Sequence, residues 1–132
     1  MNTCDTPPAP HLNYTGCTWP NAGNGNASTD TPAHWAYADL TGVSLVSAYV
    51  GTYVGYANLT GANLTGANLT GSYWAAGLAL KDANLTNANL SHLSFGYPYS
   101  SPMWTGATFK NTTCPDGSNS DNNVGATCEG HA

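Results

Sequence analysis

The sequence predicts an all-β solenoid built from four-sided coils, and two observations carry this prediction. The first is a five-residue period: Ala-Asn-Leu-Thr-Gly occurs three times without change over residues 57–71, and related units follow over 83–92. The second is polarity within the unit, because the first and third residues are apolar and the other three are polar or Gly. A period of five fits neither a helix nor a long strand. Each unit is therefore expected to form one extended side and a corner, with coils stacked at about 4.8 Å.

This pattern resembles that of the pentapeptide-repeat family, Ala-(Asn/Asp)-(Leu/Phe)-X-X, and the resemblance covers residues 33–111. It implies a right-handed quadrilateral β-helix of about four coils, in which the central Leu or Phe of each unit fills the shaft. We therefore expect a buried set of repeat leucines and alanines: Leu40, Leu45, Leu59, Leu64, Leu69, Leu85, Leu90, Ala38, Ala57, Ala62, Ala67, Ala83 and Ala88.

The chain divides into three parts. Residues 1–32 are expected to form an N-terminal cap and loop with a partial coil, 33–111 the β-helix, and 112–132 a C-terminal cap closed by a disulfide. Within the body, we expect a four-residue side at 53–56 and an expanded six-residue side at 77–82. That register stacks three aromatic residues inward on one side of the shaft: Trp35, Trp74 and Phe95.

Four cysteines are expected to lie outside the regular repeats: Cys4, Cys17, Cys114 and Cys128. They allow three connectivities. The length of the stack opposes bridges between its two ends, because a disulfide spans at most about 7 Å between Cα atoms. We therefore expect one disulfide near each end of the chain, Cys4–Cys17 and Cys114–Cys128. The C-terminal tail that holds the second one resembles the disulfide-closed ending of some bacterial members of the family. Two disulfides imply an oxidising compartment, and hence a secreted or cell-surface protein.

Composition narrows the possible functions. The formal net charge is −5, only 7% of residues are charged, and two are basic. Of the acids, only Asp39 and Asp82 fall on the coils, so neither nucleic-acid binding nor mimicry of a charged duplex is expected. No apolar run is long enough to span a membrane. The sequence carries none of the common catalytic motifs, and we expect a non-enzymatic protein without a cofactor.

The aromatic residues offer the main candidate for a binding site. The expected register puts Tyr37, Tyr56 and Tyr97 at an outward corner of three separate coils, with His34 and Tyr73 nearby. Exposed rings in a row could contact sugar rings or a protein partner. The alternative is that these rings pack only on one another.

The oxygen-rich tail offers a weaker candidate, a calcium loop containing Asp116, Ser118, Ser120 and Asp121. Its spacing departs from an EF-hand, because the sixth position is Asp121 rather than Gly and the twelfth is Thr127 rather than Glu. The alternative is a turn in which Asn and Asp side chains bond their own backbone.

Three functional hypotheses remain open from the sequence. The first is a secreted or surface scaffold or binding module of bacterial type. The second is a carbohydrate-binding or adhesive module that uses the Tyr face. The third is a structural protein that assembles by end-to-end stacking of its coils.

Overall fold

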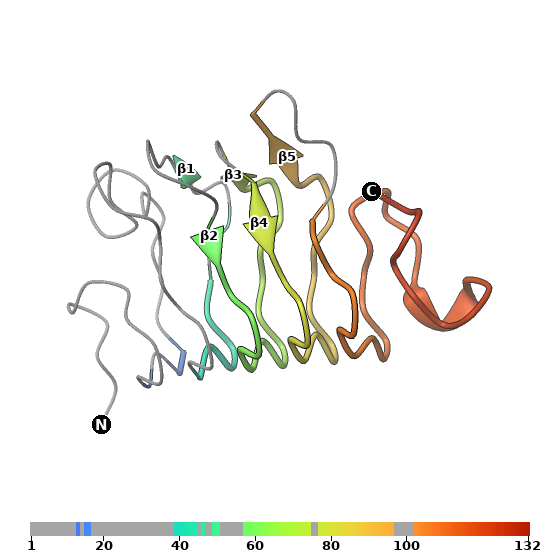
Figure 1. Ribbon diagram of the computed structural model, residues 1–132, viewed down its shortest axis with the longest axis horizontal. Helices are drawn as coiled ribbons and strands as arrows, with labels where there is room; N and C mark the ends of the chain where they lie inside the picture. The colour runs from blue at the N-terminus through green and yellow to red at the C-terminus, as the bar shows by residue number, and fades with distance from the viewer. Residues whose placement is uncertain are drawn as a thin grey trace.

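The computed structural model of the 132-residue chain describes residues 13, 15–16, 39–44, 46, 49–50, 57–74, 77–96 and 102–132. Successive coils stack along the long axis, and the C-terminal tail lies beyond the last coil (Figure 1). The strands are only two residues long: β1 (Tyr49–Val50), β2 (Ala57–Asn58), β3 (Tyr73–Trp74), β4 (Leu78–Ala79) and β5 (Ser94–Phe95). A 3-10 helix, η1 (Ser120–Asn122), lies in the tail.

The coils have four sides, each defined by a column of parallel backbone pairs. Side 1 joins the second residues of its units in the order Asn13, Asp39, Asn63, Asn84 and Thr108. Side 2 joins Ser44, Asn68, Asn89 and Thr113. Side 3 is the sheet β1-β3-β5, and side 4 is β2-β4 extended by the pair Ala79–Met103.

The corners explain why the period is five. The fifth residue of a unit takes a positive φ, as at Gly66 (69°) and Asn87 (61°), a conformation that Gly adopts freely and Asn tolerates. The first N–H of the next unit then donates to the third C=O, as from Ala67 to Leu64 and from Ala88 to Leu85, both at 3.0 Å. Three extended residues and a two-residue turn make one side.

The third residues of the units fill the shaft. Every described leucine and alanine that the sequence places in the core is buried, which confirms that prediction for Leu40, Leu59, Leu64, Leu69, Leu85, Leu90, Ala62, Ala67, Ala83 and Ala88. Leu45, Ala38 and the side chain of Ala57 lie outside the described residues. Each buried Leu contributes about 1.5–3 kcal/mol of transfer free energy, so the repeated Leu column is the main source of stability.

The register on side 3 differs from the expected one. β3 pairs with β1, so the unit containing Tyr49, rather than the 53–56 segment, stacks on the unit containing Tyr73. Val50, rather than a residue of the 53–56 segment, stands next to Trp74. Trp74 is fully buried, as predicted, and Phe95 beside it is half-buried against the core. Trp35 lies outside the described residues.

The expected six-residue side is also wrong. Gly77 is a corner residue with φ 94°, whose N–H donates to the C=O of Trp74 at 3.2 Å. The side proper runs over 78–82, and its buried central residue is Leu80. Tyr49 and Tyr73 are 24 residues apart, whereas Tyr73 and Ser94 are 21 apart. These unequal coils arise because the residues added to the basic period, 53–56, Gly77 and 98–101, fall between side 3 and side 4.

The stack continues past residue 111. Thr113 pairs in parallel with Asn89, so 112–116 is a further unit of side 2 and Cys114 is its buried central residue. Cys114 therefore belongs to the repeats, contrary to expectation. It is bonded to Cys128 as predicted, with Cα atoms 5.3 Å apart, whereas Cys4 and Cys17 lie outside the described residues. Among the described helices, none has the length and hydrophobicity needed to cross a membrane.

Candidate functional site

The outer surface of sides 1 and 2 consists of polar groups that bond one another. In five units the Oδ1 of the second residue accepts hydrogen bonds from both the backbone N–H and the hydroxyl of the fourth residue; these second residues are Asp39, Asn63, Asn68, Asn84 and Asn89. Asn63 receives both from Thr65, at 3.1 and 2.7 Å, and Asn89 receives both from Ser91, at 3.0 and 2.7 Å. These hydroxyls therefore have a structural partner, and the two sides present an almost uncharged polar surface.

Asp39 occupies the same position in its unit and shows the electrostatic effect of this motif. The Thr41 hydroxyl donates to Asp39 Oδ1 at 2.7 Å, and this bond lowers the pKa of the carboxyl below its ordinary value of 3.8. Partial burial opposes the shift, and the Thr41 N–H, at 3.1 Å, reinforces it. The bonds favour the carboxylate because each donor points at its negative charge.

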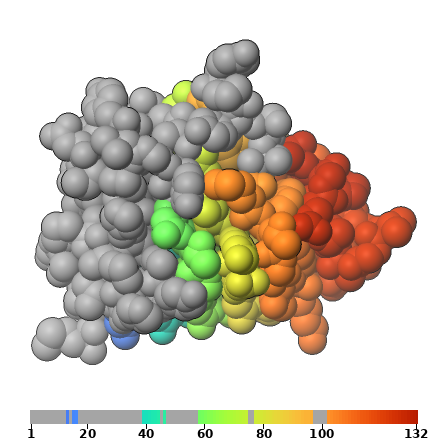
Figure 2. All heavy atoms as spheres, in the orientation of Figure 1, coloured from blue at the N-terminus to red at the C-terminus, as the bar shows by residue number. Residues whose placement is uncertain are grey.

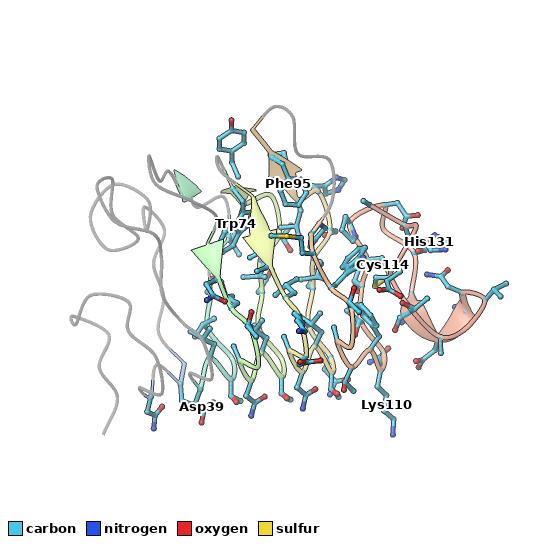
Figure 3. The ribbon with its side chains drawn as sticks, in the orientation of Figure 1. Asp39, Trp74, Phe95, Lys110, Cys114 and His131 are labelled. Carbon is cyan, nitrogen blue, oxygen red and sulfur yellow. A yellow bond between two sulfur atoms is a disulfide. The ribbon has the colours of Figure 1, made fainter. Side chains whose placement is uncertain are left out.

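Tyr73 is the part of the predicted aromatic face that the structure describes. It lies on β3 between Tyr49 of β1 and Ser94 of β5 and is half-buried. Trp74 beside it points into the shaft (Figure 3), where its Nε1 donates to the Ser72 hydroxyl at 2.8 Å. The Ser72 hydroxyl in turn donates to the C=O of Leu69 at 2.7 Å. These two bonds satisfy the buried Trp74 Nε1–H and Ser72 hydroxyl next to Tyr73.

The other predicted members of this face, His34, Tyr37, Tyr56 and Tyr97, lie outside the described residues. The aromatic face therefore remains a prediction. The observed register changes its argument, because Tyr73 pairs with Tyr49 and not with a residue of the 53–56 segment. Along the sequence, six of the eight tyrosines lie within β1 or β3 or within seven residues after β1 or β5: Tyr49, Tyr53, Tyr56, Tyr73, Tyr97 and Tyr99.

The oxygen atoms proposed for calcium serve the fold of the tail. Asp116 Oδ1 accepts from the N–H and hydroxyl of Ser118, at 2.9 and 2.6 Å, and its Oδ2 lies 3.0 Å from His131 Nδ1. Ser120 is fully buried, and its hydroxyl accepts from the N–H of Thr112 at 3.1 Å. Asp121 Oδ1 accepts from the N–H of Asn111 at 2.9 Å. These contacts fit the alternative stated above, in which the side chains of the tail bond its own backbone, and calcium binding stays a prediction.

The electrostatics of the tail follow from the same contacts. The Ser118 hydroxyl and N–H lower the pKa of Asp116 below 3.8, and His131 contributes in the same direction. Within the parts of the chain that the structure describes, no three His, Cys, Asp or Glu residues are placed to share a metal ion.

A short asparagine ladder joins the stack to the tail, and the sequence analysis missed it. Asn111 Nδ2 donates to Asn87 Oδ1 at 3.0 Å, and Asn119 Nδ2 donates to Asn111 Oδ1 at 2.8 Å. Its sequence signal is the replacement of corner Gly by Asn in two successive units of side 1. The ladder positions the tail over the last corner between sides 1 and 2.

Comparisons with known proteins found similarity to a family model and to a solved structure. A family model described as pentapeptide repeats, with eight copies, matches residues 51–73. A solved structure of HetL, a pentapeptide-repeat protein involved in heterocyst differentiation regulation from the cyanobacterium Nostoc sp. strain PCC 7120, is 23% identical with a TM-score of 0.32. The match covers 83% of this chain and 41% of HetL. No curated protein matches.

Proposed function

We propose that this chain, whose residues 51–73 match the pentapeptide-repeat family model, is a non-enzymatic binding scaffold that acts outside the cell or on its surface. The Cys114–Cys128 disulfide supports the oxidising location, since such bonds are rare in cytosolic proteins. The family implies a right-handed quadrilateral β-helix. Such a β-helix would hold the binding side chains in fixed positions.

The binding proposal rests on where the tyrosines fall along the sequence, relative to the columns of side 3 and side 4. Residues were added to the basic period between side 3 and side 4, and the additions at 53–56 and 98–101 include Tyr53, Tyr56 and Tyr99. Added segments on a rigid scaffold are where binding residues commonly lie. Tyr supplies a large apolar ring with a polar tip, which suits a partly wet interface. We take a glycan as the first ligand class to test and a protein surface as the second.

The contacts of the described hydroxyl and imidazole groups support a non-enzymatic function. Thr65, Thr86 and Ser91 each donate their hydroxyl to an Asn within the same unit. His92 is an exposed corner residue with φ 60°, and His131 faces Asp116 in the tail. Each of these groups has a role in the turn or in the tail.

Binding assays on Tyr variants test the proposal. Tyr56→Ala combined with Tyr97→Ala should abolish retention of any glycan that the wild type binds on an array, with nearly unchanged melting temperature. Tyr73→Phe keeps the ring and should bind as the wild type does, whereas Tyr73→Ala should weaken binding. If the wild type retains no glycan or protein partner and the double variant melts much earlier, the tyrosines serve packing alone. Light scattering on the same samples reports the filament alternative.

A further inference from the structure

The outer surface of side 2 is a row of small side chains without charge. Along an extended unit the second and fourth residues point away from the shaft when the third points into it. The second and fourth residues of the four stacked units are Ser44, Val46, Asn68, Thr70, Asn89, Ser91, Thr113 and Pro115. None of them is ionisable or aromatic, and only Pro115 is buried. Side 1 differs, because the same places there include Asp39 and Lys110.

Hydrogen bonds within the units fix the orientation of this row. Thr70 donates its hydroxyl and its N–H to Asn68 Oδ1, and Ser91 donates the same two groups to Asn89 Oδ1. A hydroxyl that donates keeps its acceptor lone pairs. The Nδ2 groups of Asn68 and Asn89 make no hydrogen bond with any described residue, so both stay available as donors. A ligand can therefore bind these groups without the usual entropic cost of ordering side chains.

The backbone fixes the distance between successive members of the row. Leu69 N donates to Asn89 O and Leu90 N donates to Thr113 O, both at 2.8 Å, so the units are neighbouring strands of one parallel ladder. Neighbouring strands lie about 4.8 Å apart. The coils from residue 57 onward follow one another as adjacent bands along the long axis (Figure 2), and the column from Ser44 to Thr113 makes three steps. Side 2 thus presents similar groups at a constant interval.

This interval is close to one that ice repeats at its surface. Water oxygens joined by a hydrogen bond lie about 2.75 Å apart, and tetrahedral bonding then places oxygens that share a neighbour about 4.5 Å apart. The difference from the coil interval is about 0.3 Å a step, or about 0.5 Å at either end of a match centred on the row. Hydrogen-bond lengths vary by that much. Liquid water has the same short distances, but only the crystal keeps them in line over several steps.

The composition of the row argues against other classes of ligand. It lacks the aromatic rings on which the glycan hypothesis rests. Apart from Val46 and the buried Pro115, it lacks the apolar residues that fill the centre of a protein interface. It also lacks the basic residues that a nucleic acid requires.

We propose that side 2 binds the surface of ice. The Nδ2 groups of Asn68 and Asn89 donate to water oxygens of the crystal, and the hydroxyls of Thr70 and Ser91 accept from its water molecules. Each of these bonds is weak, but a rigid row makes them together, so their contributions combine. This activity is separate from the binding proposed for the tyrosines.

Incorporation into growing ice tests this assignment on the full chain. A dilute, stirred solution is frozen slowly from a cold surface, and the protein is measured in the ice and in the remaining liquid. The wild type should pass into the ice, whereas a protein that does not bind ice is excluded from it. Thr70→Lys places a long, strongly hydrated cation in the middle of the row and should lose incorporation. A wild type that stays in the liquid overturns the proposal.

Matched controls on side 1 separate the binding face from the fold. Thr65→Lys removes the equivalent hydroxyl bond, to Asn63, and should be incorporated as the wild type is. Ser91→Lys on side 2 and Thr86→Lys on side 1 form a second pair, used where a variant of the first pair does not melt cooperatively. Equal loss of incorporation in both members of a folded pair contradicts the assignment to side 2. Retention of the wild type on crystalline cellulose or chitin but not on ice would also overturn the proposal and identify a polysaccharide as the ligand.

Discussion

Sides 1 and 2 differ from the junction between side 3 and side 4 in how they treat the five-residue period. From residue 62 to 71 and from 83 to 92 the period is unbroken, and each unit repeats the same bonds between Asn and Thr or Ser. At the junction the chain takes four, one and four extra residues in successive coils, yet the columns on either side keep their parallel pairing. From Asp39 onward, the changes in coil length are therefore confined to this junction.

This difference shows which parts of a coil carry stability. A side must present a small residue and a Leu-sized residue inward and must pair with the coils before and after it. A corner has only to connect two sides. Extra residues at a corner cost little because loop-closure free energy grows slowly with length. Variation, and with it a binding function, can therefore accumulate at the junction without loss of the shaft.

The strongest test of the regular sides is a charge in the shaft. Leu64 is fully buried, so Leu64→Asp would place an unpaired carboxylate among apolar neighbours at a cost of several kcal/mol, comparable with the whole stability of a small domain. We expect no cooperative melting transition in circular dichroism. The control is Thr65→Asp in the next position, which should fold. Normal melting of the Leu64→Asp protein would contradict the assignment of this Leu to the shaft.

The second test removes the bridge of the tail. Replacing Cys114 and Cys128 together by Ser should lower the free energy of unfolding by about 3 kcal/mol, because the closed loop of 14 residues no longer restricts the unfolded chain. Chemical denaturation measures the loss, and reduction of the wild type should reproduce it. An unchanged denaturation midpoint would mean that the asparagine ladder and the pairing with Ser118 and Ser120 hold the tail unaided.

The third test compares the two kinds of corner directly. One Gly inserted between Ala76 and Gly77 extends a corner that already holds an extra residue, and should cost less than about 0.6 kcal/mol. One Gly inserted after Gly66 should cost about 2 kcal/mol or more, since it disrupts the bond from Ala67 to Leu64 and shifts its neighbours. Thermal melting of the two variants gives the comparison. Equal costs would show that the corners are equivalent and that the gathering of extra residues has another cause.

The smallest expected effect is on acid stability. Asp39 and Asp116 have pKa values below 3.8 in the folded chain because hydroxyl and amide donors stabilise their carboxylates. Their stabilising contribution is therefore present above pH 3.8 and is lost as the pH falls through the lower folded pKa values. The melting temperature should fall between about pH 5 and about pH 3. The fall should be smaller in Asp39→Asn with Asp116→Asn; an equal fall in this variant would point to other carboxyl groups.

The shaft could be predicted from the sequence because its signal is repeated. Leu59, Leu64 and Leu69 occur in identical units, so their burial follows from the period alone. The register before them could not be predicted, because residues 48–52 and 53–56 both resemble a degenerate unit. Only the pairing of Tyr49 with Tyr73 distinguishes the two.

The same limit applies to the tail and to the candidate sites. The unit at 112–116 contains neither Ala nor Leu, so only the pairing of Thr113 with Asn89 identifies Cys114 as a central residue. Asp116, Ser118 and Asp121 have the composition of a calcium loop, but which donors their oxygens meet depends on how the tail folds back.

The column spacing has a consequence for how the chain assembles. Each paired unit finds its partner 21, 24 or 26 residues earlier in the chain, so a new coil needs only the one before it and can add as synthesis proceeds. The tail, which follows the last coil, can engage only after that coil has formed. Oxidation of Cys114 and Cys128 would then record completion of the stack, and the fraction of chains with this bond would measure how many had finished folding.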